Sequence, residues 1–112
     1  MRAVIFANGI LDDHDRVLSQ LKPEDILIAA DGGSEHCKDI GIRPDIVIGD
    51  MDSISTQLRE KFQSSGTKFI IHPRDKDQTD LELALSYAQQ SGADEVIFFG
   101  ILGGRFDLSL SN

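Results

Sequence analysis

Short apolar runs alternate with segments of helical character along the whole chain. The apolar runs occupy residues 3–7, 26–30, 46–48, 69–71 and 96–99, and the helical segments occupy residues 13–20, 34–40, 55–64 and 79–90. Strands that alternate with helices are joined by right-handed crossovers, which give a mostly parallel sheet with helices on both faces. The 112 residues suffice for one such unit. The sequence therefore predicts a single α/β domain over residues 1–112, a three-layer sandwich around a Rossmann-like sheet.

The last ten residues, GGRFDLSLSN, break this alternation. They read as a glycine turn followed by a new helix, with Asp107 as its N-cap. Only five residues follow Asp107, and a helix that short is marginal on its own. We therefore expect the sequence to be the N-terminal part of a longer protein, cut where another crossover begins.

Charge and composition limit the possible partners. The chain has 19 acidic and 11 basic residues, a net charge of −8, and no basic cluster, so a nucleic-acid backbone would be repelled. It has no apolar run long enough to span a membrane and no signal-peptide pattern. Cys37 is the only cysteine, which excludes an internal disulfide and makes a reducing cytoplasm the default location. We expect a cytoplasmic protein that binds neither nucleic acid nor membrane.

Each predicted strand is followed by glycine, by a polar or acidic residue, or by both. The carboxyl ends of strands in an open parallel sheet line its ligand-binding edge. The side chains that this places at one edge are Asn8, Asp31, Asp50, Asp52, Asp75, Asp77, Asp80, Arg105 and Asp107. Any single acid could be a helix cap or a turn residue. Caps do not explain Asp52 beside Asp50, and crowded carboxylates repel one another, so the set as a whole indicates a site.

The stretch IVIGDMDSIS predicts a metal site at this edge. Asp50 and Asp52 leave a buried strand two residues apart, so their side chains can point the same way. Mg²⁺ prefers hard oxygen ligands and usually keeps waters and substrate phosphate oxygens. Asp31 and Asp80, from neighbouring strand ends, could complete or extend the site. The number of metal ions stays open.

The stretch GILGGR predicts a phosphate-binding loop. Gly100, Gly103 and Gly104 allow close backbone approach, and their N–H groups can surround an anion. Arg105 would add a bidentate clamp on phosphate oxygens. Neither the P-loop pattern nor the G-x-G-x-x-G pattern occurs, and a plain turn remains the alternative.

The three histidines carry no metal-binding signal. His14, His36 and His72 lie outside metal-ligand spacing of one another and of Cys37. We read all three as ordinary surface or core residues.

Four motifs together carry a family resemblance. ADGG, GDMDS, KDQTDLELAL and GILGGRFD occur in this order, and through them the chain resembles thiamine pyrophosphokinase over essentially its whole length. The matching part is that family's N-terminal catalytic domain. The resemblance implies transfer of a pyrophosphoryl group from ATP to the hydroxymethyl oxygen of thiamine, which yields thiamine diphosphate and AMP. It also implies Mg²⁺ as cofactor and ATP as co-substrate.

The resemblance assigns roles at the matching positions. Asp31 stands at the acid of DGG, Asp50 and Asp52 stand at the paired acids that hold Mg²⁺, and the D-x-T-D and GGRxD segments lie near metal, substrate and ATP phosphates. The resulting catalytic set is Asp50, Asp52, Asp80 and Arg105. The metal set is Asp31, Asp50, Asp52 and Asp80. The nucleotide set is Asn8, Gly9, Asp31, Gly32, Gly33, Asp77, Thr79, Gly103, Gly104 and Asp107.

Two departures from the family pattern limit what carries over. Leu108 stands where many members have histidine, so no histidine role is inherited there. The family's second, β-rich domain, which contributes to the thiamine pocket, is absent from the chain. The resemblance also implies that the intact protein is a homodimer with thiamine pockets built from both subunits. We therefore expect these 112 residues alone to turn over thiamine negligibly.

Two other functions remain as alternatives. The first is pyrophosphoryl transfer to another hydroxymethyl acceptor, such as a pterin. The second is a non-enzymatic, Mg²⁺-binding regulatory domain like a response-regulator receiver. Receivers place paired acids after the first strand, where this chain has Asn8 and Gly9, so the receiver interpretation is the weaker one.

Overall fold

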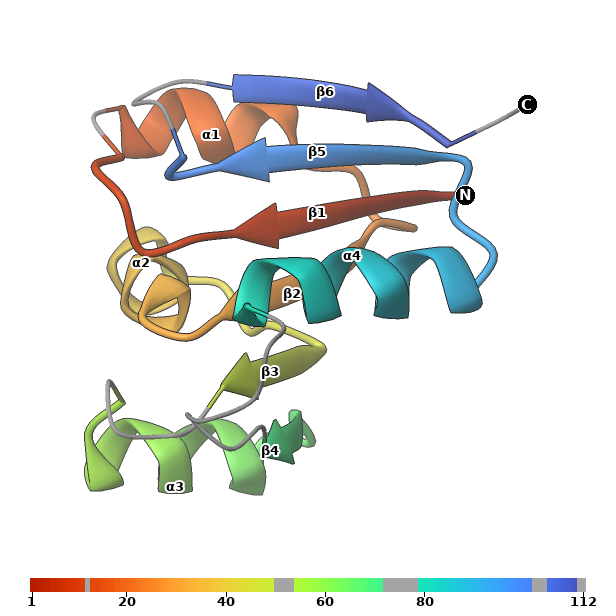
Figure 1. Ribbon diagram of the computed structural model, residues 1–112. Helices are drawn as coiled ribbons and strands as arrows, with labels where there is room; N and C mark the ends of the chain where they lie inside the picture. Colours follow the sequence, from red (N-terminus) through yellow and green to blue (C-terminus); the bar gives the residue numbers. More distant parts are fainter. Residues whose placement is uncertain (12, 50–53, 72–78, 102–104, 111–112) are drawn as a thin grey trace.

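The computed structural model describes residues 1–11, 13–49, 54–71, 79–101 and 105–110. Within these residues, six strands form one sheet with the order β4-β3-β2-β1-β5-β6 (Figure 1). The strands are β1 (Arg2–Phe6), β2 (Ile26–Ala30), β3 (Ile46–Gly49), β4 (Lys68–Ile71), β5 (Glu95–Phe99) and β6 (Arg105–Ser109). The first five run parallel and β6 pairs antiparallel with β5. The predicted mostly parallel α/β fold is confirmed.

Four helices alternate with the parallel strands in the described part of the chain. They are α1 (His14–Gln20), α2 (Gly33–Ile40), α3 (Thr56–Ser64) and α4 (Asp80–Gln90). Asp13, Ser55 and Thr79 cap α1, α3 and α4, because each side chain accepts a hydrogen bond from a backbone N–H in the first turn. Helix α2 has no side-chain cap and begins directly after Asp31 and Gly32. None of the described helices is long and apolar enough to cross a membrane.

The helices cover the sheet in two unequal layers. Helices α1, α2 and α3 bury Val17, Cys37, Leu58 and Phe62 against one face, while α4 buries Ala84 and Ala88 against the other. Successive strand residues point to opposite faces, and both faces are covered, so β1 and β3 are apolar at nearly every position. The predicted three-layer sandwich follows from this arrangement.

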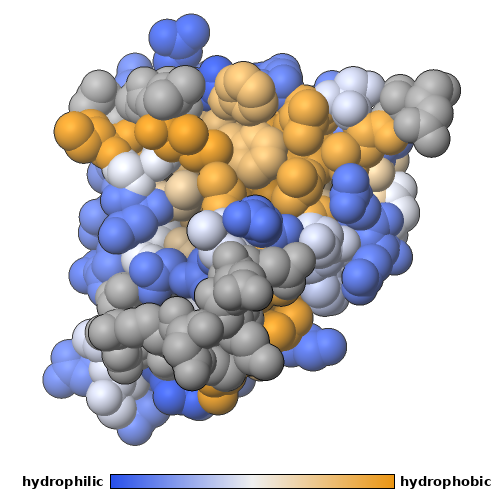
Figure 2. Space-filling model, viewed as in Figure 1, coloured by the Kyte–Doolittle hydropathy of each residue, from blue (hydrophilic) through white to orange (hydrophobic). Residues whose placement is uncertain are grey.

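One helix does not cover the whole of the second face. Helix α4 packs over β1, β2 and β3. The part over β5 and β6 holds an apolar groove of about 390 Å³. Its lining residues are Leu81, Glu82, Leu85, Phe98, Ile101, Phe106 and Leu108. Apolar side chains gather over this area in Figure 2, and Phe106 remains 48% exposed.

The predicted helix after Asp107 is wrong, because Arg105–Ser109 form strand β6. All five residues of β6 pair with residues of β5, from Phe99↔Arg105 to Glu95↔Ser109. The pattern explains the difference. Phe106, Leu108 and Leu110 are apolar at every second position, which is the period of a strand and not of a helix. Asp107 is therefore a strand residue rather than an N-cap.

Candidate functional site

The loops at the carboxyl ends of β1, β2 and β5 pack backbone against backbone. A β-carbon on Gly33 would lie 1.8 Å from the carbonyl oxygen of Phe6, and one on Gly9 would lie 2.0 Å from the carbonyl oxygen of Gly100. Gly100 itself has a φ of +84° and lies against Ala7. These glycines leave no room for a side chain. Glycine at positions 9 and 33 is thus required by the packing of the loops that form the site edge.

Asn8 joins the first two of these loops. A β-carbon on Gly32 would lie 2.2 Å from the side-chain Oδ1 of Asn8, so the amide rests directly on the backbone that opens α2. The structure therefore brings together Asn8, Gly9, Gly32 and Gly33, four residues of the predicted nucleotide set.

Asp31 has a strained backbone and a carboxylate oxygen without a partner. Its φ is +51°, in the left-handed region that costs a non-glycine residue about 1–2 kcal/mol. Its N–H donates to the carbonyl of Ile48 at 2.7 Å, and its carbonyl accepts from the Ser34 hydroxyl. Its Oδ1 is buried and finds no hydrogen-bond partner among the described residues. Strain together with an unsatisfied buried oxygen is typical of a ligand-binding position.

Asp80 also lies near the end of β3, although it belongs to α4, on the face of the sheet opposite to α2. It is the first residue of α4, and its Oδ2 lies 3.3 Å from the point that a β-carbon on Gly49 would occupy. The Cα of Asp31 lies 3.2 Å from that same point. Asp31 and Asp80 thus border the last residue of β3, and Asp50 is the next residue in the chain. The structure thus brings Asp31 and Asp80 to one strand end.

The remaining members of the predicted metal site lie outside the described residues. These are Asp50 and Asp52, and the same holds for Asp75, Asp77, Gly103, Gly104 and His72. Within the described ranges, no three His, Cys, Asp or Glu side chains gather as a metal site. The metal assignment of Asp31, Asp50, Asp52 and Asp80 stays a prediction.

The side chain of Thr79 is hydrogen-bonded to the first turn of helix α4. Its Oγ1 accepts a hydrogen bond from the N–H of Glu82 at 3.1 Å and donates to the Glu82 carboxylate at 3.2 Å. Thr79 is therefore the N-cap of α4, and it fixes the start of this helix and with it the backbone position of Asp80.

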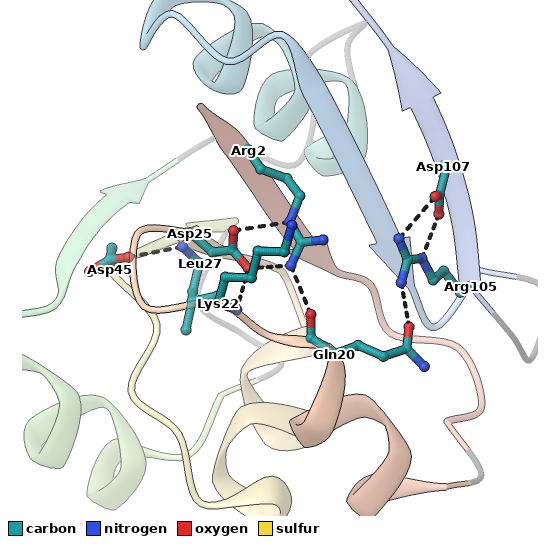
Figure 3. Close-up of polar contacts among 8 residues, drawn as sticks. All are labelled: Arg2, Gln20, Lys22, Asp25, Leu27, Asp45, Arg105 and Asp107. Atoms are coloured by element: carbon teal, nitrogen blue, oxygen red, sulfur yellow. Dashed lines mark hydrogen bonds and ion pairs between the residues drawn. The ribbon is translucent and has the colours of Figure 1, made fainter.

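Arg105 contacts Asp107 and Gln20 (Figure 3). Its Nε and Nη2 donate to the two oxygens of Asp107 at 2.7 and 3.0 Å, and its Nη1 donates to Oε1 of Gln20, the last residue of α1, at 2.6 Å. The hydrogen bonds from Arg105 lower the pKa of Asp107 from its ordinary value. Arg105 thus lies on the face that carries α1, whereas Asp80 belongs to the helix on the opposite face.

Sequence reasoning missed two residues at this edge, His36 and Gly49. His36, in the first half of α2, donates from Nε2 to the carbonyl oxygen of Gly9. Gly49 reads in the sequence as the end of a buried strand, yet it leaves the space beside which Asp31 and Asp80 meet. The one available signal for His36 was its place just after the ADGG motif, near the end of α2 that faces the first loop.

Known proteins are similar to this chain in sequence and in fold. Residues 17–112 match the family described as thiamin pyrophosphokinase, catalytic domain. The chain is 40% identical over 85 residues to a thiamine pyrophosphokinase of Bacillus subtilis (strain 168), over 76% of this chain and 40% of the relative. It is 38% identical over 76 residues to thiamine pyrophosphokinase 2 of Arabidopsis thaliana, over 62% of this chain and 28% of the relative.

A solved structure supports the same relationship. The crystal structure of thiamine pyrophosphokinase from Bacillus subtilis aligns with a TM-score of 0.75 at 31% identity, over 94% of this chain and 49% of that chain. The chain thus spans about half or less of the length of these relatives. Because the family match covers most of the chain, we conclude that it belongs to the thiamine pyrophosphokinase family, in the part described as the catalytic domain.

Proposed function

We propose that this chain forms the nucleotide- and metal-binding part of an enzyme that transfers a pyrophosphoryl group from ATP to the hydroxymethyl group of thiamine, giving thiamine diphosphate and AMP. Family membership supports the reaction. The assignment of the site rests on the environment of Asp31. Its Oδ1 is buried and unpaired, its backbone is strained and lies beside Gly49, and Oδ2 of Asp80 lies close to the same glycine.

The acidic residues fit Mg²⁺. Carboxylate oxygens are the ligands that this ion prefers, and a buried carboxylate oxygen without a hydrogen-bond donor needs a cation or a proton. Asp31, Asp50, Asp52 and Asp80 would hold the ion. When bound, it would neutralise negative charge on the phosphate oxygens of ATP. In a chain with a net charge of −8, such neutralisation also removes the repulsion that a polyphosphate would meet.

The backbone of the glycine loops supports the nucleotide role. Asn8, Gly9, Gly32 and Gly33 come from neighbouring strand ends, where Gly9 and Gly33 pack directly on backbone carbonyls and the side chain of Asn8 lies on Gly32. Backbone N–H groups held in this way bind anions without a cost for ordering. Asp77, Thr79, Gly103, Gly104 and Asp107 complete the proposed nucleotide set.

Arg105 is proposed as a phosphate ligand that exchanges partners. Its side chain is 34% exposed and begins opposite Phe99, at the carboxyl end of β5. Phosphate oxygens would replace Gln20 and Asp107 as acceptors, and they offer the same paired geometry that the carboxylate of Asp107 now supplies. Pyrophosphoryl transfer concentrates charge on these oxygens, which is where an arginine stabilises the transition state.

We propose that the binding of thiamine, the acceptor of the pyrophosphoryl group, needs residues beyond these 112. Positioning the thiamine oxygen against the β-phosphorus supplies much of the rate. The chain covers 49% of the Bacillus subtilis enzyme structure that it matches. We therefore propose that the intact protein works in the cytoplasm as a homodimer, with thiamine pockets shared between subunits, and that these residues alone bind Mg²⁺ and ATP but release AMP negligibly with thiamine.

The test is calorimetric titration with ATP, with and without Mg²⁺, of the parent and of Asp31→Asn. The control is Asp39→Asn, an exposed acid on α2 that loses the same charge. We expect Asp31→Asn to lose the Mg²⁺-dependent part of ATP binding and Asp39→Asn to keep it. Equal titration curves for both variants would contradict the site. An AMP-release assay of the intact protein with thiamine, and with a hydroxymethylpterin, then tests the acceptor.

A further inference from the structure

We propose that His36 is a positioning residue that fixes the loop after β1 for nucleotide binding. The inference rests on the proposed function, because that function assigns Asn8 and Gly9 to the nucleotide. His36 lies in α2, and its Nε2–H donates to the carbonyl oxygen of Gly9, 27 residues earlier in the chain. This hydrogen bond connects the loop after β1 to the helix that follows Asp31.

The loop is held from two sides at Gly9. On one side its Cα packs so closely on the carbonyl of Gly100 that an added β-carbon would lie 2.0 Å from that oxygen. On the other side the imidazole of His36 donates a hydrogen bond to the carbonyl oxygen of Gly9. Packing against Gly100 limits where the loop lies, and among the described residues His36 is the donor that binds the Gly9 carbonyl oxygen.

The direction of that carbonyl determines what the loop presents. The described residues contain no cis peptide, and in a trans peptide the C=O and the following N–H point in opposite directions. With the Gly9 carbonyl aimed at α2, the N–H of Ile10 points away from α2. It finds no acceptor among the described residues, and Ile10 as a residue is 72% exposed. His36 thus leaves the N–H of Ile10 without an acceptor among the described residues, and therefore available to a phosphate oxygen.

The hydrogen bond to the Gly9 carbonyl requires a donor at the position of Nε2, and it does not require a charged side chain. Neutral imidazole protonated at Nε2 and imidazolium both donate from this nitrogen. The side-chain amide nitrogen of glutamine can reach a similar position. Leucine has no donor but fills similar space. His36→Gln and His36→Leu therefore separate the hydrogen bond from the volume of the side chain.

The experiment compares the parent, His36→Leu, His36→Gln and the control Lys38→Gln. Lys38 lies on the same helix, is exposed and pairs only at the surface with Glu35. Two quantities are measured: the backbone ¹⁵N order parameters of Gly9 and Ile10 without ligand, and the affinity for Mg²⁺ plus ATP. Thermal unfolding is recorded for each variant as the readout of a merely structural role.

We expect His36→Leu to lower the order parameters at Gly9 and Ile10 from rigid values near 0.85 to below about 0.6, and to weaken ATP binding about tenfold. His36→Gln should restore both, and Lys38→Gln should change neither. Unchanged order parameters in His36→Leu, or a loosened loop with unchanged ATP affinity, would overturn the proposal. So would equal loss of thermal stability in both His36 variants with affinity intact. A parent that binds no ATP would overturn the proposed function, while the order parameters would still decide whether His36 fixes the loop.

Discussion

The carboxylate of Asp80 lies against Gly49, so that the first turn of α4 and the end of β3 share one narrow space. A β-carbon on Gly49 would be 3.3 Å from Oδ2 of Asp80 and 3.2 Å from the Cα of Asp31. Both distances are shorter than ordinary van der Waals contact between such atoms. The separation of the two acids thus depends on the absence of a side chain at Gly49.

Gly49→Ala is expected to weaken Mg²⁺-dependent ATP binding about tenfold or more, because the methyl group displaces Asp31 and Asp80 by a few tenths of an ångström. Calorimetric titration measures the effect. Gly41→Ala is the matched control, since Gly41 has open space around it and should affect stability alone. ATP affinity in Gly49→Ala equal to that of Gly41→Ala would show that this space has no part in binding.

Gly33→Ala is expected to destabilise the fold by about 3 kcal/mol or more, because its β-carbon would lie 1.8 Å from the carbonyl oxygen of Phe6 and a backbone must move. Gly41→Ala should cost only about 1–2 kcal/mol, from its left-handed φ of +89°. Urea unfolding compares the two. Similar midpoints would mean that the start of α2 can shift away from β1 without loss.

Asp25→Asn is expected to destabilise the protein by about 3 kcal/mol at pH 7, because it leaves the part-buried guanidinium of Arg2 without the carboxylate that it binds. The Asp25 side chain is 3% exposed and accepts from Nε and Nη2 of Arg2 and from the N–H of Lys22 (Figure 3). Burial by itself would raise the pKa of Asp25, but these hydrogen bonds lower it below its ordinary value.

The lowered pKa of Asp25 sets the pH dependence. Its contribution to stability is present above the ordinary carboxyl pKa of about 3.9 and is lost as the pH falls through the lower pKa of the folded state. The stability difference between the parent and Asp25→Asn should therefore be constant near neutrality and shrink below about pH 4. Asp94→Asn, which removes an exposed partner of the terminal amine, should change stability little. A difference that persists unchanged to pH 2 would refute the ion-pair explanation.

Arg105→Lys is expected to weaken ATP binding about ten- to a hundredfold, because an ammonium group cannot make the paired hydrogen bonds of a guanidinium. Gln20→Met removes the acceptor that Arg105 uses on α1 and should leave ATP binding equal or stronger. Titration of both variants separates the two roles. If Arg105→Lys binds ATP within twofold of the parent, Arg105 serves only to attach β6 to α1.

The sequence was sufficient to predict the five parallel strands of the sheet because strand and helix periods are local. The apolar run of residues 46–48 and the helical segment of residues 79–90 depend on residues within a few positions of one another, and both appear where expected. The prediction of a helix in the last ten residues was wrong for the opposite reason. A glycine turn followed by Asp107 is compatible with a helix start, and only pairing with the distant strand β5 decides for a strand.

The proximity of Asp31 and Asp80 was predictable for the reason that applies to the parallel strands. Asp31 and Asp80 follow from the rule that strand ends gather at one edge, and the structure brings them together. The hydrogen bond from His36 to Gly9 and the one from Arg105 to Gln20 join residues 27 and 85 positions apart. No periodicity encodes contacts of that kind, because they depend on how completed elements pack.

Strand β1 has consequences for the order in which the chain can fold during synthesis. It lies between β2, which begins at Ile26, and β5, which pairs with it from Arg2↔Glu95 to Phe6↔Phe99. A nascent chain can close the β2 side early, since domains form from the N-terminus as they emerge from the ribosome. The β5 side has no partner until residues 95–99 are made. Until then the future centre of the sheet is an open strand edge, the kind of surface that chaperones cover and that pairs with other chains.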